Sequence, residues 1–311
     1  MNSYPYASGA IKSLSNKILD KNKIYRFSSL KKEELLKALN DAGYGTDYSS
    51  LEKLIDSEFI KLKETMKINT PNPKFTSLFF LAGDIQNITA LYKSKIFQVD
   101  CPQLNETGVY DTNLLVDAII KGKTTKDESL NRLVNSLNKA TSGIVSAKLI
   151  SRLIDNTIYS ECLKVVRFNK CLKTYYKVKI DTTNILTFMR MKRLRWNVDQ
   201  FKSLTLSGGT IDINELSKYY NKPGEELVKF LAPYYNEALS KIVSKYNSTN
   251  DISLLEINLN QLVLTIMEQF KNDIADIGPT VYYLFCKEAE SKNIRMIYSN
   301  QNVDMNLLLE Y

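Results

Sequence analysis

A short motif recurs three times in this chain, and an internal repeat restricts the possible folds more than any other sequence feature. The motif is an acidic residue, two variable residues, asparagine and isoleucine. Its copies begin at Asp84, Asp181 and Glu290. A second pattern, D-x-N-x-L, follows each copy and begins at Asp111, Asp212 and Asp304. Because both patterns occur in the same order three times, the sequence predicts a triplicated unit of about 100 residues, a common module size.

The acid and the asparagine of each copy are three residues apart, so on a helix they share one face. The pairs are Asp84 with Asn87, Asp181 with Asn184, and Glu290 with Asn293. The three acids could meet on a pseudo-threefold axis and hold a cation, or each pair could fasten its helix to a neighbour within its own repeat. We favour the second interpretation, because residues repeated with a fold usually serve packing and satisfy buried polar groups.

Apolar spacing around the motifs predicts helices. Ile85, Ile88, Leu91, Tyr92 and Ile96 recur at intervals of three and four residues, and the residues after Asp181 follow the same rule. We expect each acid near the start of its helix and the basic residues near the end, where both complement the helix dipole. Basic residues follow the first two acids at matching positions: Lys93 and Lys95, then Arg190 and Lys192.

Further signals also favour helices over strands. Thr125-x-x-Glu128 and Ser253-x-x-Glu256 resemble capping boxes that open helices. The chain contains only 11 glycines and 7 prolines, so it has few residues for turns. No convincing alternating strand pattern is present. The sequence therefore predicts an all-α fold, with helical modules at residues 1–118, 119–216 and 217–311.

The net charge of +8 fits nucleic acid, an anionic membrane surface or an acidic protein partner. The densest basic run is Arg190 to Trp196, with Arg190, Lys192, Arg193 and Arg195. Nucleic-acid binding would favour one basic stripe with exposed aromatic residues, whereas on a helix these four residues point around most of the circumference. We therefore interpret the run as a charged helix end facing an acidic partner, and we add Arg295 of the third copy to this possible partner interface.

Catalytic chemistry has little support in the sequence. The chain has no histidine, which is the commonest general acid or base and metal ligand. Ser207-Gly208-Gly209-Thr210 lacks the lysine of a phosphate-binding loop, and the cysteines show no metal-ligand spacing. We expect no catalytic residue, no cofactor and no metal. An enzyme that uses carboxylates or a metal at the repeat axis stays open as an alternative.

The four cysteines, Cys101, Cys162, Cys171 and Cys286, are expected to be reduced, buried thiols of a cytosolic protein. The first ten residues do not resemble a secretory signal. Apolar stretches such as Leu78 to Ala82 are far shorter than the roughly 20 residues that cross a bilayer. We therefore expect no membrane span.

Several segments resemble the C-subunit family of V-type and A-type ATPases (ATP synthases). Tyr4-x-Tyr6-Ala7 and the segment Leu39 to Gly45 are similar to the start of that family. Asp84 to Ile88 with the basic residues that follow, and Asp181 to Ile185 with Arg190-Met191-Lys192, match its two D-x-x-N-[LI] helices. The most specific match is Lys287 to Arg295, which is close to the family's K-E-x-E-x-x-N-I-R signature. The resemblance covers essentially the whole chain.

This resemblance implies a funnel of three similar helical modules in a pseudo-threefold arrangement around a central hollow. It implies a non-catalytic central-stalk connector, the counterpart of the d subunit of eukaryotic vacuolar ATPases. The connector joins the central axle, made of the D and F subunits, to the membrane rotor ring and transmits torque for ion translocation. The resemblance further implies one copy in a hetero-oligomeric complex, without nucleic acid, held peripherally at the cytoplasmic face of the membrane.

A basic helical scaffold or nucleic-acid-binding protein is the alternative class. It accounts for the positive charge but not for the triplication together with the family signature.

Overall fold

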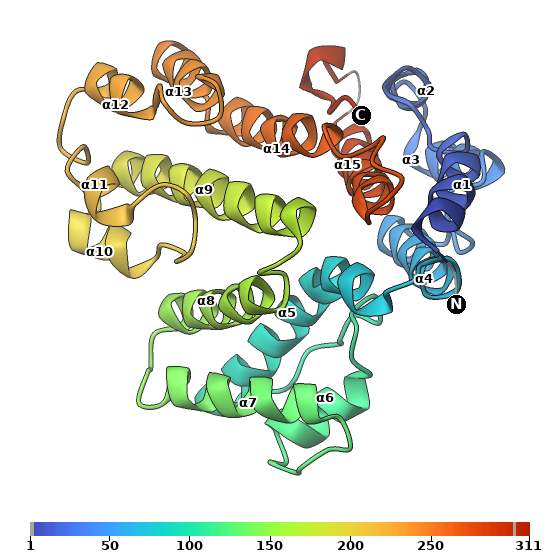
Figure 1. Ribbon diagram of the computed structural model, residues 1–311, viewed down its shortest axis with the longest axis horizontal. Coiled ribbons are helices and arrows are strands. Elements are labelled where there is room, and N and C mark those ends of the chain that lie inside the picture. Colours follow the sequence, from blue (N-terminus) through green and yellow to red (C-terminus); the bar gives the residue numbers. More distant parts are fainter. Residues whose placement is uncertain (1–2, 301–302) are drawn as a thin grey trace. The chain divides into compact units, whose positions relative to one another are not determined.

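A computed structural model describes residues 3–300 and 303–311, and every regular element in these ranges is a helix (Figure 1). The prediction of an all-α fold is confirmed. The chain divides into two compact units. The first unit contains Met1–Asp84, Leu104–Asp111 and Leu264–Tyr311, and the second contains Ile85–Gln103 and Thr112–Val263. The division falls within α5 (Pro73–Phe97) and α14 (Ile252–Glu268).

The first unit combines segments from both parts of the chain. Its further elements are α1 (Tyr4–Ser15), α2 (Lys21–Phe27), α3 (Lys32–Asp41), α4 (Leu51–Asn69), α15 (Gly278–Ser299) and the 3-10 turn η1 (Met305–Leu307). Helices α1, α2 and α4 pack against α15 (Figure 1). One apolar cluster joins Leu39 and Leu54 to Ile294 of α15, and another joins Ile11 of α1 to Leu284. Residues from the two ends of the chain therefore share one core.

The second unit contains most of the remaining helices. They are α6 (Thr112–Ile119), α7 (Glu128–Thr141), α8 (Ala147–Val165), α9 (Lys170–Arg193), α10 (Val198–Ser203), α11 (Ile213–Ser217), α12 (Gly224–Leu231) and α13 (Ala238–Thr249). Helix α7 packs beside α8, and α12 beside α13 (Figure 1). The ring of Phe188 on α9 meets those of Phe201 and Tyr220 edge to face, at centroid distances of 5.2 and 5.1 Å.

The motif acids do not lie at helix starts, so that expectation is wrong. Asp84, Asp181 and Glu290 sit near the middle of α5, α9 and α15, and all three are fully buried. The sequence before each motif is also helix-forming and extends the helix backwards by more than two turns. The basic residues do lie in the last turns of α5 and α9, at Lys95 and at Arg190 to Arg193.

Both predicted capping boxes are also wrong. Helix α7 is capped by Asp127, whose carboxylate accepts the N–H groups of Ser129 and Leu130. At the start of α14, Asp251 accepts from the N–H groups of Ser253 and Leu254. A charged aspartate at the N-cap also complements the helix dipole, which explains why it takes this place from the neighbouring threonine or serine.

Three of the four cysteines are buried as expected, but Cys101 is exposed, so the expectation of buried thiols is wrong for that residue. All four are free thiols. Among the described residues, no helix combines the length and the apolar character needed to span a membrane. The two boundaries between the three modules, at 118 and 216, stay a prediction.

Candidate functional site

The buried carboxylate of Asp84 holds a loop of the first unit. Its oxygens accept hydrogen bonds from the N–H groups of Val109 and Tyr110, at 2.6 and 3.2 Å. These two residues directly precede Asp111, the first residue of the D-x-N-x-L pattern that leads into α6. The first motif and the second pattern are therefore the two partners of one contact.

Asp181 makes the same contact in the second unit. It accepts from the N–H groups of Thr210 and Ile211 at 2.9 to 3.1 Å. These residues directly precede Asp212, which is the N-cap of α11. The hydroxyl of Tyr235 donates a further hydrogen bond to Asp181, at 2.5 Å.

Glu290 makes the corresponding contact with the beginning of the chain. Its Oε1 accepts from the N–H of Leu19 at 2.6 Å, and the next residue, Asp20, is the N-cap of α2. Asp20-Lys21-Asn22-Lys23-Ile24 is thus a fourth version of the second pattern, with isoleucine in place of leucine. This version lies far before its motif in the chain, whereas the sequence predicts the second pattern after each motif.

A second sequence signal supports this correspondence. Asp20 and Asp212 are each followed, at the same distance, by E-E-L-x-K-x-L, which begins at Glu33 and at Glu225. These segments form α3 and α12. The N-terminal segment therefore corresponds to residues 212–231. The start of the first contacts the acid of the third motif, and the start of the second contacts the acid of the second motif.

The asparagines of the second and third motifs both donate to and accept from the backbone. Asn184 donates to the carbonyl of Leu206 at 2.9 Å and accepts from its N–H at 2.8 Å. Asn293 makes the same two bonds, with the same lengths, to Leu309 near the C-terminus. Each asparagine thus pairs with both the N–H and the C=O of one buried residue, as buried polar groups require.

Glycine allows the loop to approach the acid. A Cβ atom at Gly108 would collide with a carboxylate oxygen of Asp84, and one at Gly209 would collide with Asp181. Both glycines stand three residues before the aspartate of the second pattern, so the signal is G-x-x-D-x-N.

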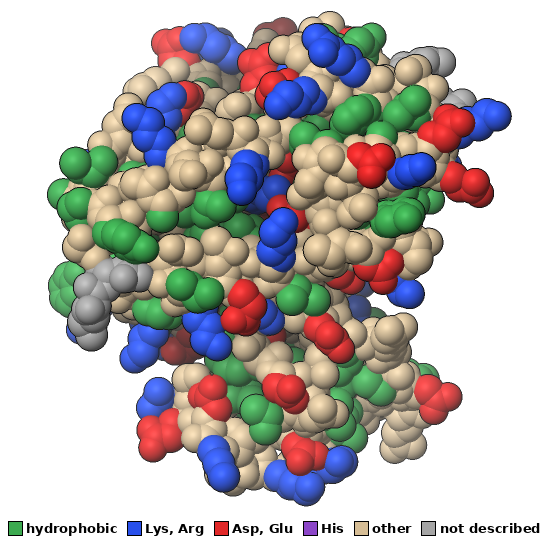
Figure 2. Space-filling model, turned by 90° about the vertical axis from the view of Figure 1, so that its right-hand side faces the viewer, with side chains coloured by type: hydrophobic (Ala, Val, Ile, Leu, Met, Phe, Trp, Pro, Cys, Tyr) green, Lys and Arg blue, Asp and Glu red, His purple; other side chains and the backbone are tan. Residues whose placement is uncertain are grey.

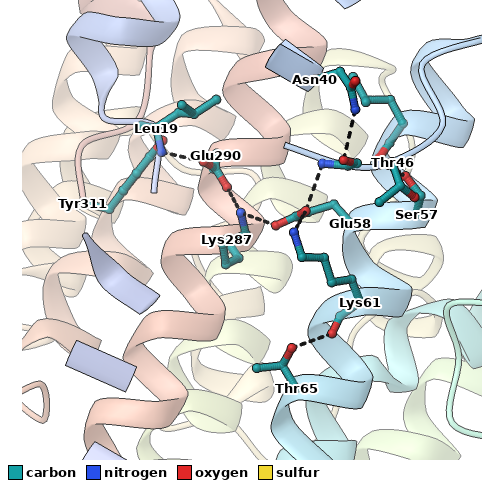
Figure 3. A network of polar contacts seen from close by, with 12 residues as sticks. Leu19, Asn40, Thr46, Ser57, Glu58, Lys61, Thr65, Lys287, Glu290 and Tyr311 are labelled. Atoms are coloured by element: carbon teal, nitrogen blue, oxygen red, sulfur yellow. Dashed lines mark hydrogen bonds and ion pairs between the residues drawn. The ribbon is translucent and has the colours of Figure 1, made fainter. Parts of the chain in front are cut away.

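The third contact is reinforced by buried ions, which Figure 3 shows. Lys287 of α15 forms ion pairs with Glu290 and, at 2.7 Å, with Glu58 of α4. Glu58 also accepts from the N–H of Gly45 at 2.9 Å, and the hydroxyl of Tyr311 donates to the carbonyl of Leu19 at 2.6 Å. The network joins both chain ends to α4 and α15.

Burial by itself would lower the pKa of Lys287, but the two carboxylates outweigh it and raise this pKa above its usual value. The lysine therefore stays charged. Its side chain is only 5% exposed, so the two carboxylates must compensate the lost hydration. Lys287 belongs to the family signature, but the sequence predicts no contact for it, and nothing in the sequence points to Glu58.

The predicted partner residues occupy different surroundings. Arg190 is paired with Glu256 at 2.5 Å, and Lys192 donates to the carbonyl of Lys222 at 3.0 Å. Arg193 and Arg195 are exposed. Arg295 belongs to the first unit, where it pairs with Glu52 at 2.6 Å.

Acidic and basic side chains of the described residues are interspersed on the face drawn in Figure 2. The positive net charge is thus not gathered into a stripe on that face. Within residues 3–300 and 303–311, no three His, Cys, Asp or Glu side chains form a group that could hold a metal ion.

These features define the class of protein: all-helical, with repeated buried acids that hold backbone amides ahead of helix starts. The family model described as ATP synthase (C/AC39) subunit matches residues 7–304, so the chain belongs to this family. The resemblance seen in the sequence is confirmed.

Several similar proteins are named as C subunits of A-type ATP synthases. The C subunit of the A-type ATP synthase of Thermococcus onnurineus (strain NA1) is 24% identical, over 94% of this chain and 85% of that protein. The C subunit of the A-type ATP synthase of Pyrococcus abyssi has the same identity and coverage. That of Methanococcoides burtonii is 20% identical, over 94% of this chain and 89% of that protein.

The close approach of Gly209 to Asp181 predicts that Gly209→Ala lowers the free energy of unfolding by about 2–3 kcal/mol, because the new methyl group displaces two buried hydrogen bonds. Urea unfolding followed by circular dichroism measures the loss. Gly9→Ala is the matched control, since a Cβ at this exposed position of α1 meets nothing within 4 Å. It should be neutral or stabilise by up to about 1 kcal/mol. Equal effects of the two substitutions would contradict the prediction.

Burial raises the pKa of Asp84 from 3.8 to about 6, against the opposing effect of its hydrogen bonds. The folded state therefore keeps a proton that the unfolded chain has already released, and stability falls as the pH rises from about 4 to 6. The total contribution is up to about 3 kcal/mol. Asp84→Asn should remove this part of the pH dependence of the urea midpoint. A wild-type slope in the variant would show that Asp84 does not titrate in this range.

Replacing Lys287 leaves Glu58 and Glu290 buried without their cation. We expect Lys287→Met to lower the free energy of unfolding by about 3–5 kcal/mol. Adding Glu58→Gln and Glu290→Gln should restore much of the loss, because no uncompensated charge remains. Lys292→Met is the control on the same helix; its side chain is 36% exposed and pairs with Glu288, so its loss should be about 0–1 kcal/mol. A loss below about 1 kcal/mol for Lys287→Met would rule out a tightly coupled network.

Proposed function

We propose that this chain is the non-catalytic central-stalk connector of a rotary V-type or A-type ATPase. In this function it joins the central axle, made of the D and F subunits, to the membrane rotor ring and transmits torque for ion translocation. The observation that carries the proposal is the family match over residues 7–304, together with relatives named as C subunits of A-type ATP synthases along 85–89% of their own length.

The internal contacts suit a part that must resist deformation. The three motif helices α5, α9 and α15 have 25, 24 and 22 residues, and each carries a buried acid that fixes the start of another helical segment. In a buried contact of this kind, only one arrangement gives every polar group a hydrogen-bond partner. Any displacement leaves a buried group unpaired, which raises the free energy. The same contact at three places supports a triplicated protein, with modules 1–118, 119–216 and 217–311 around a central hollow.

The proposal places one copy of the chain in the complex, held peripherally at the cytoplasmic face of the membrane. ATP chemistry belongs to other subunits. Arg193 and Arg195 are the best candidates for contact with an acidic partner, because both are exposed. Arg190, Lys192 and Arg295 are weaker candidates, since their side chains already have partners within the chain.

Native mass spectrometry of the tagged chain, purified from gently solubilised membranes, tests the assignment. We expect one copy together with axle, head and ring subunits. Recovery of the chain alone, or with nucleic acid and no ATPase subunit, would overturn the proposal in favour of a basic scaffold.

The same purification tests the partner interface. The variant with Arg193→Glu and Arg195→Glu should reduce the recovery of axle or ring subunits about tenfold or more, because each lost charged contact is worth about 1.5–3 kcal/mol. The control carries Lys173→Glu and Lys202→Glu, which make the same change of net charge at exposed sites of the second unit. Unchanged recovery in the first variant, or equal losses in both, would exclude these arginines as a specific interface.

A further inference from the structure

A pocket of about 320 Å³ lies within the second unit, between the end of α5, the start of α8 and the end of α9. Its charged lining consists of Lys93, Lys148, Arg152 and Asp155. Three cations thus face one carboxylate. The pocket has a positive excess, and neither the repeat contacts nor the family match assigns it a role.

The cations of this pocket retain free hydrogen-bonding capacity. In the part of the chain that the structure describes, the side chains of Lys93, Lys148 and Arg152 make no hydrogen bond. Arg152 has only a 3.8 Å ion pair with Asp155. Its side chain is only 17% exposed, so water can replace few of the missing hydrogen bonds. Guanidinium groups so far from water usually use several of their five donors.

The desolvation of this ion pair is incompletely compensated. Burial lowers the pKa of Arg152 and raises that of Asp155, so for both groups the lost hydration outweighs their mutual attraction. A second carboxylate in the pocket would supply the missing charge for Arg152. The start of α8 at Ala147 also lines the pocket, and the positive end of a 19-residue helix favours an anion there.

The remaining wall is apolar and aromatic. Trp196 and Met191 line it, and the ammonium of Lys148 lies 4.3 Å from the centroid of the Trp196 ring. An occupant must therefore combine a carboxylate with an adjacent apolar surface. A nucleic-acid backbone offers phosphates at regular spacing along a strand, whereas this pocket places three cations and one carboxylate around a single site.

We propose that this pocket binds an acidic segment of a partner protein, with a Glu or Asp side chain between Lys93, Lys148 and Arg152 and a neighbouring apolar side chain against Trp196. The inference rests on the proposed function, because it takes the partner to be another component of the same complex. It adds the cations Lys93, Lys148 and Arg152 to the basic residues of the run at Arg190 to Arg195.

Trp196 is the only tryptophan of the chain, so its fluorescence reports directly on this pocket. A hexaglutamate peptide titrated into the full-length protein should change the Trp196 emission saturably, and the change should weaken with added salt. A hexaglutamine peptide is the control and should have no effect. An unchanged emission with hexaglutamate would overturn the proposal.

A variant with Lys93→Gln and Lys148→Gln keeps the ion pair of Arg152 and Asp155. Its binding of labelled hexaglutamate, measured by fluorescence anisotropy, should be about tenfold weaker or more. The control carries Lys164→Gln and Lys173→Gln at exposed positions of α8 and α9. Wild-type affinity in the first variant would overturn the proposal. So would an equal response to inorganic phosphate, which indicates a simple anion site, or tighter binding of a thymidine decanucleotide.

Different results would contradict the acidic-segment site and the proposed function. If native complexes contain the axle and ring subunits but hexaglutamate leaves Trp196 unchanged, only the inference falls. If hexaglutamate binds as expected but no ATPase subunit is recovered with the chain, the proposed function falls, and with it the assignment of the partner to that complex.

Discussion

The structure depends on one type of contact. A carboxylate buried in the middle of a long helix accepts hydrogen bonds from backbone N–H groups, and the donor residues directly precede an aspartate at the start of another helix. An ionised carboxylate without water is unstable unless hydrogen bonds or charges compensate it. The loop amides supply part of that compensation, although burial still raises the pKa of all three acids. The amides in turn find an acceptor that replaces water. Each acid therefore fixes the helix start that it contacts, and Gly108 and Gly209 allow the first two loops to come close enough.

The three contacts are not equivalent, and their differences follow from the number of amides available. Asp84 and Asp181 each accept from two consecutive N–H groups, whereas the only N–H that donates to Glu290 among the described residues is that of Leu19. Lys287, one turn before the acid, supplies the missing compensation as a charge. The corresponding positions of the first two helices are Leu81 and Val178, so the lysine belongs to the third contact alone.

The sequence allowed the helical class, the repeated motif and the shared face of acid and asparagine to be predicted, because all three depend on local spacing. It did not reveal what the acids bind. Their partners lie 25 to 30 residues further on for Asp84 and Asp181, and 271 residues away for Glu290. The capping boxes failed because two competing N-caps stood close together, and only the backbone geometry decides between them. Glu58 was missed because it belongs to no repeated pattern.

The contact of Glu290 with Leu19 explains why the first unit needs both ends of the chain. The segment that follows Asp20 corresponds to the one that follows Asp212, yet it precedes its acid in the chain instead of following it. Glu290 thus contacts the segment at Asp20, although another copy of the second pattern follows this acid at Asp304. Ordinary surface contact between chain ends would fray, because exposed ion pairs contribute little. The ion pair of Lys287 with Glu58 instead lies buried beside the apolar core that α15 shares with the N-terminal helices, so it breaks only when that core opens.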